Sequence, residues 1–204
     1  MSIGGFRIPD VPIDVPYAEF DDVYSAALLE ANGVPPDADA LLAALESPTE
    51  VVRAAAARTL GARGVRAAIA PLEPLAREGQ GTDRAEAAYA LARLGEQESG
   101  REGLRACLEL PADWSIAAIK AAGMLACLDD PSGVPVIMRA LKAKNSILRT
   151  VAVKQLYYLA RFDGREVDGR RLDVHELLEK AARDRDADIA RQARIELRDL
   201  DRGS

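Results

Sequence analysis

The sequence predicts an all-α solenoid built from about five antiparallel helix pairs, and three observations predict it. Aromatic residues make up only 4% of the 204 residues while hydrophobic residues make up 49%, a balance that favours aliphatic helix contacts over an aromatic-rich β-sandwich. Leu60, Leu94 and Leu128 lie 34 residues apart, and each ends an alanine-rich run. Between these runs, apolar residues recur at i, i+3 and i+4, which places one apolar stripe on each helix.

The first predicted element is an extended arm over residues 1–16. Pro9, Pro12 and Pro16 each push the preceding residue toward extended backbone, so the arm is not expected to be helical. A helix is predicted from Tyr17 to Ala31, ending at Asn32-Gly33. We expect this helix to cap the first pair through four apolar residues, Phe20, Val23, Tyr24 and Leu28.

Residues 17–204 are predicted to form a single repeat domain. The helix pairs are expected at approximately 36–64, 65–98, 99–130, 131–171 and 172–200. Helix starts are predicted at Pro48, Pro111 and Pro131, and turns at Gly61, Gly64, Gly95, Gly100 and Gly133. Residues 163–171 are a polar insertion between the fourth and fifth pairs, interpreted as a solvated connector or short hairpin, with a ligand-contacting loop as the alternative.

One segment carries a family resemblance. From Ser47 to Gly64 the chain has a turn with a proline and an acid, then Val-Arg, a run of alanines and Leu-Gly. This pattern resembles the second helix of HEAT and HEAT-like (PBS-lyase-type) repeats, and weaker copies extend the resemblance over about residues 36–200. A tetratricopeptide array has the same period, but its tryptophan, tyrosine and late-proline pattern is absent. The resemblance implies a right-handed solenoid whose second helices line a concave surface, with the arginine at Arg53 commonly bonded to the acidic turn of a neighbouring repeat.

Charge and composition exclude several classes of function. The chain has 27 basic and 33 acidic residues, a formal net charge of −6 and a sequence pI near 5.0, so the totals do not favour nucleic acid or an anionic membrane as a partner. The N-terminus lacks a signal-peptide apolar core, and no apolar run is long enough to span a bilayer, so we expect a cytoplasmic protein. A single histidine excludes histidine-rich metal sites, and no cofactor is expected.

The predicted second helices are rich in basic residues. The windows 51–60, 84–94, 114–128, 147–161 and 189–198 hold eleven basic and two acidic residues, a net charge of +9. Adding the four acids that precede these helices lowers that value to +5. The bases indicate either an anion-binding concave face or a ladder of bonds between repeats. The candidate partner-binding residues are Arg149, Lys154, Tyr157, Tyr158, Arg161, Arg191, Arg194, Trp114 and Lys120.

No catalytic residues are identified in the sequence. Cys107 and Cys127 have small apolar neighbours and are interpreted as buried, reduced thiols. The acidic pairs Asp21-Asp22 and Asp129-Asp130 are expected to cap a helix start and a turn. His175 is expected at an ordinary first-turn position of a helix.

The favoured function is therefore a non-enzymatic protein-binding module: a scaffold, assembly factor or inhibitor. Its partner is expected to be a protein with an acidic or extended segment, bound on the concave face. The alternative is a nucleic-acid-binding protein, in which bases and tyrosines hold phosphates and stacked bases. An enzymatic version of that alternative resembles the HEAT-like DNA glycosylases, with Asp113, Trp114 and Arg149 as the residues to test.

Overall fold

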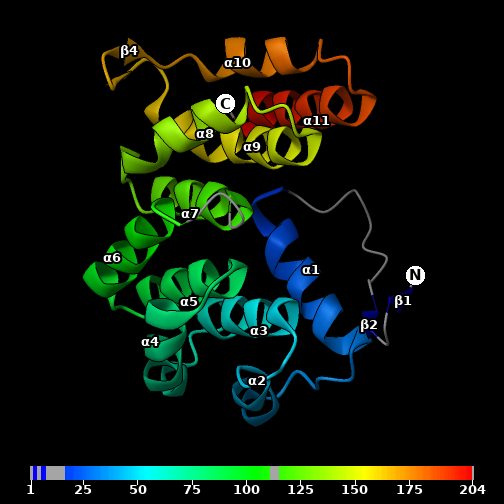
Figure 1. Ribbon diagram of the computed structural model, residues 1–204, viewed down its shortest axis with the longest axis vertical. Helices are drawn as coiled ribbons and strands as arrows, with labels where there is room; N and C mark the ends of the chain where they lie inside the picture. Colours follow the sequence, from blue (N-terminus) through cyan, green and yellow to red (C-terminus); the bar gives the residue numbers. More distant parts are fainter. Residues whose placement is uncertain (1, 4–5, 8–16, 111–114, 204) are drawn as a thin grey trace. The chain divides into compact units, whose positions relative to one another are not determined.

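The computed structural model describes residues 2–3, 6–7, 17–110 and 115–203 (Figure 1). These residues contain eleven α-helices and two pairs of two-residue strands. Backbone contacts divide the chain into two compact units, residues 1–103 and 104–204. The prediction of an all-α protein made of helix pairs is confirmed.

The N-terminal unit begins with strands β1 (Ser2–Ile3) and β2 (Phe6–Arg7), which pair antiparallel. The proline-containing part of the predicted arm, residues 8–16, lies outside the described residues. Helix α1 (Tyr17–Ala31) follows with the predicted bounds. It ends at Gly33, whose φ of 77° is a left-handed conformation that glycine adopts without strain.

Helix α1 packs against α3, as a capping helix should. The contact differs in part from the prediction, because Val23 is 39% exposed whereas Leu28 and Leu29 are buried. Asp22 also departs from its predicted capping role, because it lies within α1 and bonds to arginines of other helices. The side chain of Phe20 lies outside the described residues.

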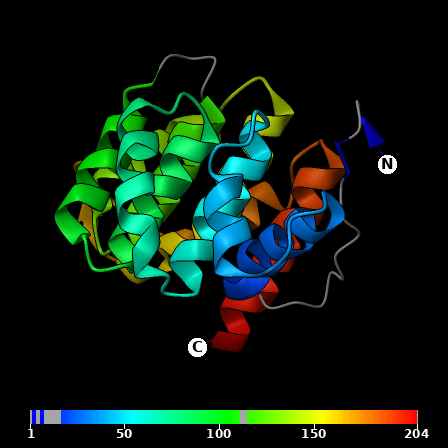
Figure 2. The same ribbon diagram turned by 90° about the horizontal axis from the view of Figure 1, so that it is seen from below.

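Two helix pairs complete this unit: α2 (Ala38–Ala44) with α3 (Glu50–Ala62), and α4 (Ile69–Glu78) with α5 (Thr82–Arg93). A 3-10 turn, η1 (Arg66–Ala68), precedes α4. Figures 1 and 2 show α3 and α5 side by side, with α2 and α4 packed on them.

Gly61 and Gly100 are not turn residues as predicted, because they lie inside α3 and α6. A Cβ on Gly61 would lie 2.8 Å from the Cα and Cβ atoms of Ala90 in α5. The missing side chain therefore permits α3 and α5 to pack closely, which is the role of small residues between stacked helices.

The C-terminal unit contains three further pairs. Helix α6 (Gln97–Leu108), within which the boundary between the units falls, precedes α7 (Ser115–Cys127). Helix α8 (Val134–Ala140) precedes α9 (Ser146–Leu159), and α10 (Val174–Ala181) precedes α11 (Ala187–Gly203). The 3-10 turns η3 (Pro131–Gly133) and η4 (Ala160–Phe162) flank α8 and α9. Strands β3 (Glu166–Val167) and β4 (Arg170–Arg171) form a hairpin between the last two pairs.

Helix α9 lies between α7 and α11 and is central to this unit. Its Leu156 and Leu159 are fully buried together with Ile137 of α8, Phe162 of η4 and Leu178 of α10. These four elements therefore share one apolar core, which fixes the frame on which the surface features of the unit are built.

The two cysteines are both free thiols. Cys107 is buried as predicted, whereas Cys127 is only half-buried, which corrects the prediction for that residue. Within the described ranges, no helix is long and apolar enough to cross a bilayer, and no cluster of three or more histidine, cysteine or acidic residues is placed to hold a metal ion.

Candidate functional site

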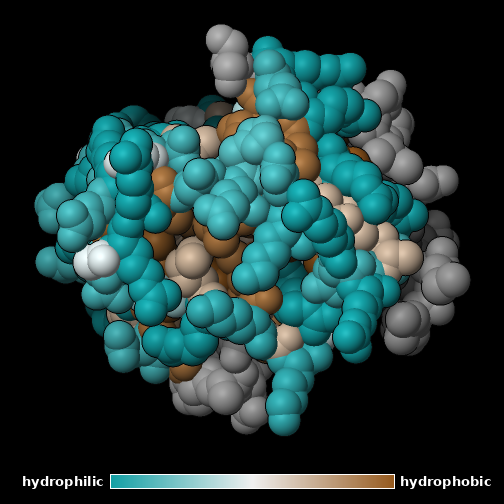
Figure 3. Space-filling view, turned by 90° about the horizontal axis from the view of Figure 1, so that it is seen from above, coloured by the Kyte–Doolittle hydropathy of each residue, from teal (hydrophilic) through white to brown (hydrophobic). Residues whose placement is uncertain are grey.

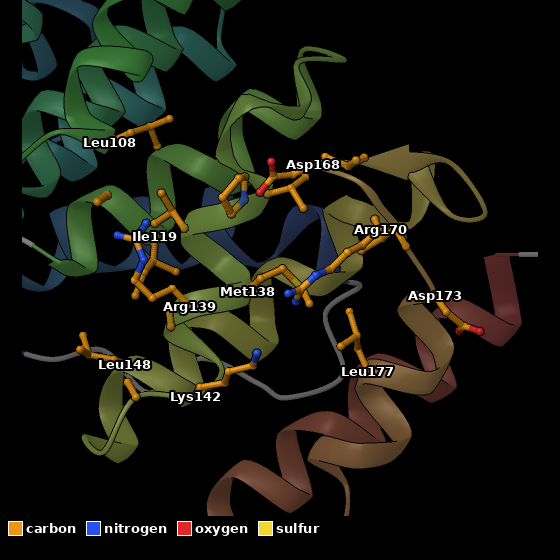
Figure 4. Close-up of a pocket in the computed structure, with 18 of the residues that line it drawn as sticks. Leu108, Ile119, Met138, Arg139, Lys142, Leu148, Asp168, Arg170, Asp173 and Leu177 are labelled. Carbon is orange, nitrogen blue, oxygen red and sulfur yellow. The ribbon is translucent and has the colours of Figure 1, made fainter.

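The C-terminal unit carries a groove of about 1050 Å³ that is lined mainly by α8, α10, the end of α6 and the β3–β4 hairpin (Figure 4). Figure 3 shows apolar surface between hydrophilic residues on the side of the molecule where α10 lies. This volume is at the upper end of the range for small-molecule sites, which extends to roughly 1000 Å³.

The hairpin that forms one wall is built locally by the Asp168-Gly169 dipeptide. Both residues have positive φ, 53° and 70°, as the two-residue type I′ turn requires. The strands pair Glu166 with Arg171 and Val167 with Arg170. This arrangement is the short hairpin that the sequence allowed for residues 163–171.

Backbone hydrogen bonds and a buried anchor hold this hairpin against the unit. The amide of Gly164 donates to the carbonyl of Leu172 at 2.8 Å, and the amide of Leu172 donates to the carbonyl of Arg165 at 2.9 Å. The Leu172 side chain is 5% exposed. The carboxylate of Asp163 accepts a hydrogen bond from the Val174 amide, so the loop is also tied to the start of α10.

The floor of the groove is apolar. Met138 of α8, Leu148 of α9 and Leu177 of α10 are half-buried and rest on the buried core beneath. Met138 and Leu177 each lie beside a fully buried neighbour on the same helix, because Ile137 and Leu178 are both 0% exposed. The apolar stripe of each short helix is thus wider than the core can cover, and its margin faces the groove.

The rim of the groove is basic. Arg139, Lys142, Arg170, Arg171 and Lys180 line it with exposed side chains, and within the described parts of the chain none of the five forms an ion pair. Three acids also line the groove: Asp168, Asp173 and Glu176. Among the described lining residues, five bases against three acids give a formal charge of +2. The carboxylate of Asp173 is engaged because it caps α10 by accepting a bond from the Glu176 amide.

The candidate residues taken from the sequence lie elsewhere. Arg149 bonds to Asp184 and to the carbonyls of Ala143 and Lys144. The pKa of Asp184 is below its usual value because its carboxylate accepts a bond from the backbone of Asp186, with Arg149 adding to the effect. The structure therefore gives Arg149 an intramolecular role between the turns that precede α9 and α11.

Three other candidate arginines also have partners within the chain. Arg161 donates to the carbonyl of Cys127 at 2.8 Å and to Asp129 at 3.2 Å. Arg191 pairs with Asp188 of its own helix, and Arg194 donates to the carbonyl of Ala182. These contacts use at least part of the hydrogen-bonding capacity that was expected to serve a partner.

The remaining candidates do not form one exposed patch. Lys120, Lys154, Tyr157 and Tyr158 are half-buried, the two tyrosine rings meet edge to face at 5.7 Å, and Tyr158 packs against the core. Trp114 and Asp113 lie outside the described residues. None of the eight described candidates lines the groove.

One sequence pattern could have pointed to the groove, although composition could not. Asp168-Gly169 between Val167 and Arg170 is a strong hairpin sequence, and two consecutive arginines follow it. The apolar stripes of α8 and α10 do not by themselves show which residues the core covers, and Met138 and Leu177 face the groove.

A family model described as HEAT repeats matches residues 38–123. The match runs from α2 into α7, and the resemblance inferred from Val52-Arg53 and the alanine run is thus confirmed.

Other comparisons are less informative. No curated protein matches the chain. Among solved structures, a crystal structure of an engineered protein from the Northeast Structural Genomics Consortium is similar over 92% of this chain and 88% of that chain, with a TM-score of 0.48 and 20% sequence identity.

The residues that match the HEAT-repeat model show the arginine contact that the resemblance implied. Arg53 of α3 bonds to Asp83 at the start of α5, with a shortest distance of 2.6 Å, and also donates to the carbonyl of Ser47. Asp83 is 1% exposed. Arg149 makes the equivalent contact with Asp184 outside the matched region, so the ladder interpretation applies to both arginines.

A second polar cluster connects the second helices of the HEAT repeats with α1. Arg58 of α3 forms a bidentate pair with Glu86 of α5, at 2.8 and 3.1 Å, and both residues are buried. Asp22 of α1 contacts Arg58 at 3.4 Å and Arg93 at 3.1 Å. Both arginines lie 5.8 Å from the ring centroid of Tyr89. Because these groups satisfy one another inside the unit, we assign the cluster a structural role.

Proposed function

We propose that this protein is a non-enzymatic protein-binding module, a scaffold, assembly factor or inhibitor, and that it holds its partner in the groove of the C-terminal unit. HEAT repeats typically mediate contacts between proteins. The observation that carries the proposal is the groove itself, in which Met138, Leu148 and Leu177 reach the surface inside a basic rim. A buried apolar centre with a polar rim is the usual composition of a protein interface.

The chemistry of the lining supports binding over catalysis. Among the described residues that line the groove there is no cysteine, histidine, serine or threonine. The nucleophiles that the described lining does contain are lysine amines and carboxylates, and no histidine lies beside them there to act as a general base. The histidine of the chain, His175, is exposed in the first turn of α10, as expected, and does not line the groove.

The sequence placed the partner on the face formed by the second helices. The groove supports the proposal better, because Arg149, Arg161 and Arg194 on that face donate to atoms of this chain. By contrast, the rim arginines are exposed and form no ion pair within the described ranges.

The test is affinity capture from the source cell, with and without nuclease, comparing Met138→Glu with Ile147→Glu. Ile147 is the matched control because it is 59% exposed and does not line the groove, so both variants add one carboxylate to an apolar surface position. We expect a specific protein to be recovered with the wild type and with Ile147→Glu, and lost with Met138→Glu.

Two results would contradict the proposal. Retention of the partner by Met138→Glu, together with its loss in the double variant Lys120→Glu and Lys154→Glu, would assign binding to the face of the second helices. Recovery of nucleic acid, or of proteins that disappear after nuclease treatment, would support the nucleic-acid alternative. Circular dichroism of each variant would verify that the helices remain formed.

A further inference from the structure

We propose that the groove takes an acidic amphipathic helix: a partner segment whose apolar stripe faces Met138, Leu148 and Leu177 and whose flanking carboxylates meet the basic rim. This inference rests on the proposed function, because it names the partner of the same groove. Three features carry it: the distribution of unpaired charge, the hydrogen bonding of the backbone around the groove and the position of the apolar side chains.

Charge complementarity gives the sign of the partner. In the C-terminal unit, several arginines outside the groove are paired with acids of the chain, as in Arg105 with Asp130 and Arg149 with Asp184. The five rim bases form no such pair within the described residues. Exposed cations that surround an apolar centre attract a segment of opposite charge and set its register.

The two units also differ in their overall charge. Residues 1–103 contain 9 basic and 17 acidic residues, for a net charge of −8, whereas residues 104–204 contain 18 basic and 16 acidic residues, for a net charge of +2. All five lysines of the chain lie in the second unit, and two of them, Lys142 and Lys180, line the groove. The local field of the groove is therefore opposite in sign to that of the whole protein.

The backbone around the groove favours a helix over an extended segment. Most of the lining residues belong to α6, α7, α8, α9 and α10, whose amide and carbonyl groups are largely bonded within their own helices. An extended segment would lose water from its amides without finding partners there, and such unmet groups are costly. The hairpin strands are only two residues long, too short to pair with an added strand. A helix satisfies its own backbone and needs only side-chain contacts.

The apolar side chains match the stripe of such a helix. Met138 and Leu177 come from two different helices, and Leu148 from a third, so together they form a floor rather than a single pocket. Figure 4 shows Arg170 extending from the hairpin toward Met138, which places a guanidinium beside the apolar floor. Leucines at i, i+3 or i+4 and i+7 of a partner helix would contact the floor while acids on both sides meet Arg170 and Lys142.

The experiment titrates the full-length protein with synthetic peptides of one length and measures binding by fluorescence anisotropy and by NMR of the methionine and leucine methyl groups. The first peptide is a helix with a leucine stripe flanked by glutamates. The second replaces the glutamates with glutamine, and the third keeps the composition of the first but places prolines that prevent a helix. We expect the first peptide to bind and to shift the methyl signals of Met138, Leu148 and Leu177.

A matched pair of protein variants distinguishes the effect of a base on the rim from the effect of the charge of the whole protein. Lys142→Glu changes a rim base, and Lys144→Glu changes an exposed base two residues away that does not line the groove. Because reversal of one rim charge removes an attraction and adds a repulsion, we expect Lys142→Glu to lower the affinity for the acidic peptide by about three- to tenfold. Lys144→Glu should leave the affinity within about twofold. Carbodiimide coupling of the bound peptide should give amide crosslinks to Lys142 and Lys180.

Each contrary result overturns a defined part of the inference. Equal affinity of the glutamine peptide would show that the partner need not be acidic, and equal affinity of the proline peptide would show that it need not be helical. Absence of methyl shifts with every peptide, or displacement of the acidic peptide by a duplex DNA of equal concentration, would overturn the inference as a whole. The capture experiment with Met138→Glu tests the proposed function separately, so a failure here and a failure there can be distinguished.

Discussion

Removal of one partner from the buried ion pair of Arg58 and Glu86 should destabilise the N-terminal unit strongly. The two side chains are 8% and 2% exposed and share two hydrogen bonds. The variant Arg58→Met leaves the Glu86 carboxylate in the interior without the guanidinium. One-sided loss of such a pair costs about 3–5 kcal/mol. With a urea dependence of about 2 kcal/mol per molar, the unfolding midpoint should fall by about 1.5–2.5 M.

The assay is urea unfolding followed by far-ultraviolet circular dichroism, with hydrogen exchange of the α3 and α5 amides as the local readout. The control is Arg77→Met, because Arg77 pairs with Glu78 at the surface and both are 71% exposed. Exposed pairs contribute about 0–1 kcal/mol, so this change should be small.

A double variant tests the physical reason. Arg58→Met with Glu86→Met removes both charges and retains apolar volume, and replacements of this kind are often neutral or stabilising. It should therefore recover most of the stability that Arg58→Met loses. The reasoning would be refuted if Arg58→Met cost less than about 1 kcal/mol, or if the double variant were as unstable as the single one.

Three further predictions concern local features. Gly61→Ala should destabilise the protein by about 1–3 kcal/mol in thermal unfolding, because its Cβ would meet Ala90; helix propensity alone predicts the opposite sign, a gain of about 1 kcal/mol. Gly169→Ala should destabilise the hairpin by about 1–2 kcal/mol, because alanine is strained at a φ of 70° although no neighbouring atom would clash with its Cβ. The destabilisation should appear as faster hydrogen exchange of the Leu172 amide, and unchanged exchange would contradict the prediction. Burial opposes ionisation of Asp130, but bonds from Ser132 and Arg105 outweigh it and lower its pKa. The stabilising effect of the Asp130 carboxylate is therefore present above the pKa of the unfolded state and is lost as pH falls through the pKa of the folded state. In urea titrations at acid pH, the difference in unfolding free energy between wild type and Asp130→Asn should therefore become smaller. A larger difference would contradict this account.

Local chemistry along the chain determined most of the fold. The 3.6-residue period set the helices and their pairing, and Gly33 ended α1 where the sequence predicted it. Asp130 caps the turn before α8 by accepting the Ser132 amide, as an acid at that position should. These features depend on neighbours within a few residues, so they can be inferred from the order of the residues.

The candidate site depended on contacts between distant residues. Sequence could count the bases of the second helices, but it could not show that Arg149 is engaged by Asp184 while Arg170 forms no ion pair within the described ranges. Nor could it separate Leu177 from Leu178, since both belong to one apolar stripe and only the packing of α10 decides which of them the core covers. Sequence alone therefore determined the repeat and some of the helix ends, such as that of α1. Tertiary packing decided which charges and apolar side chains were left for a partner, because burial and pairing depend on residues that are distant along the chain.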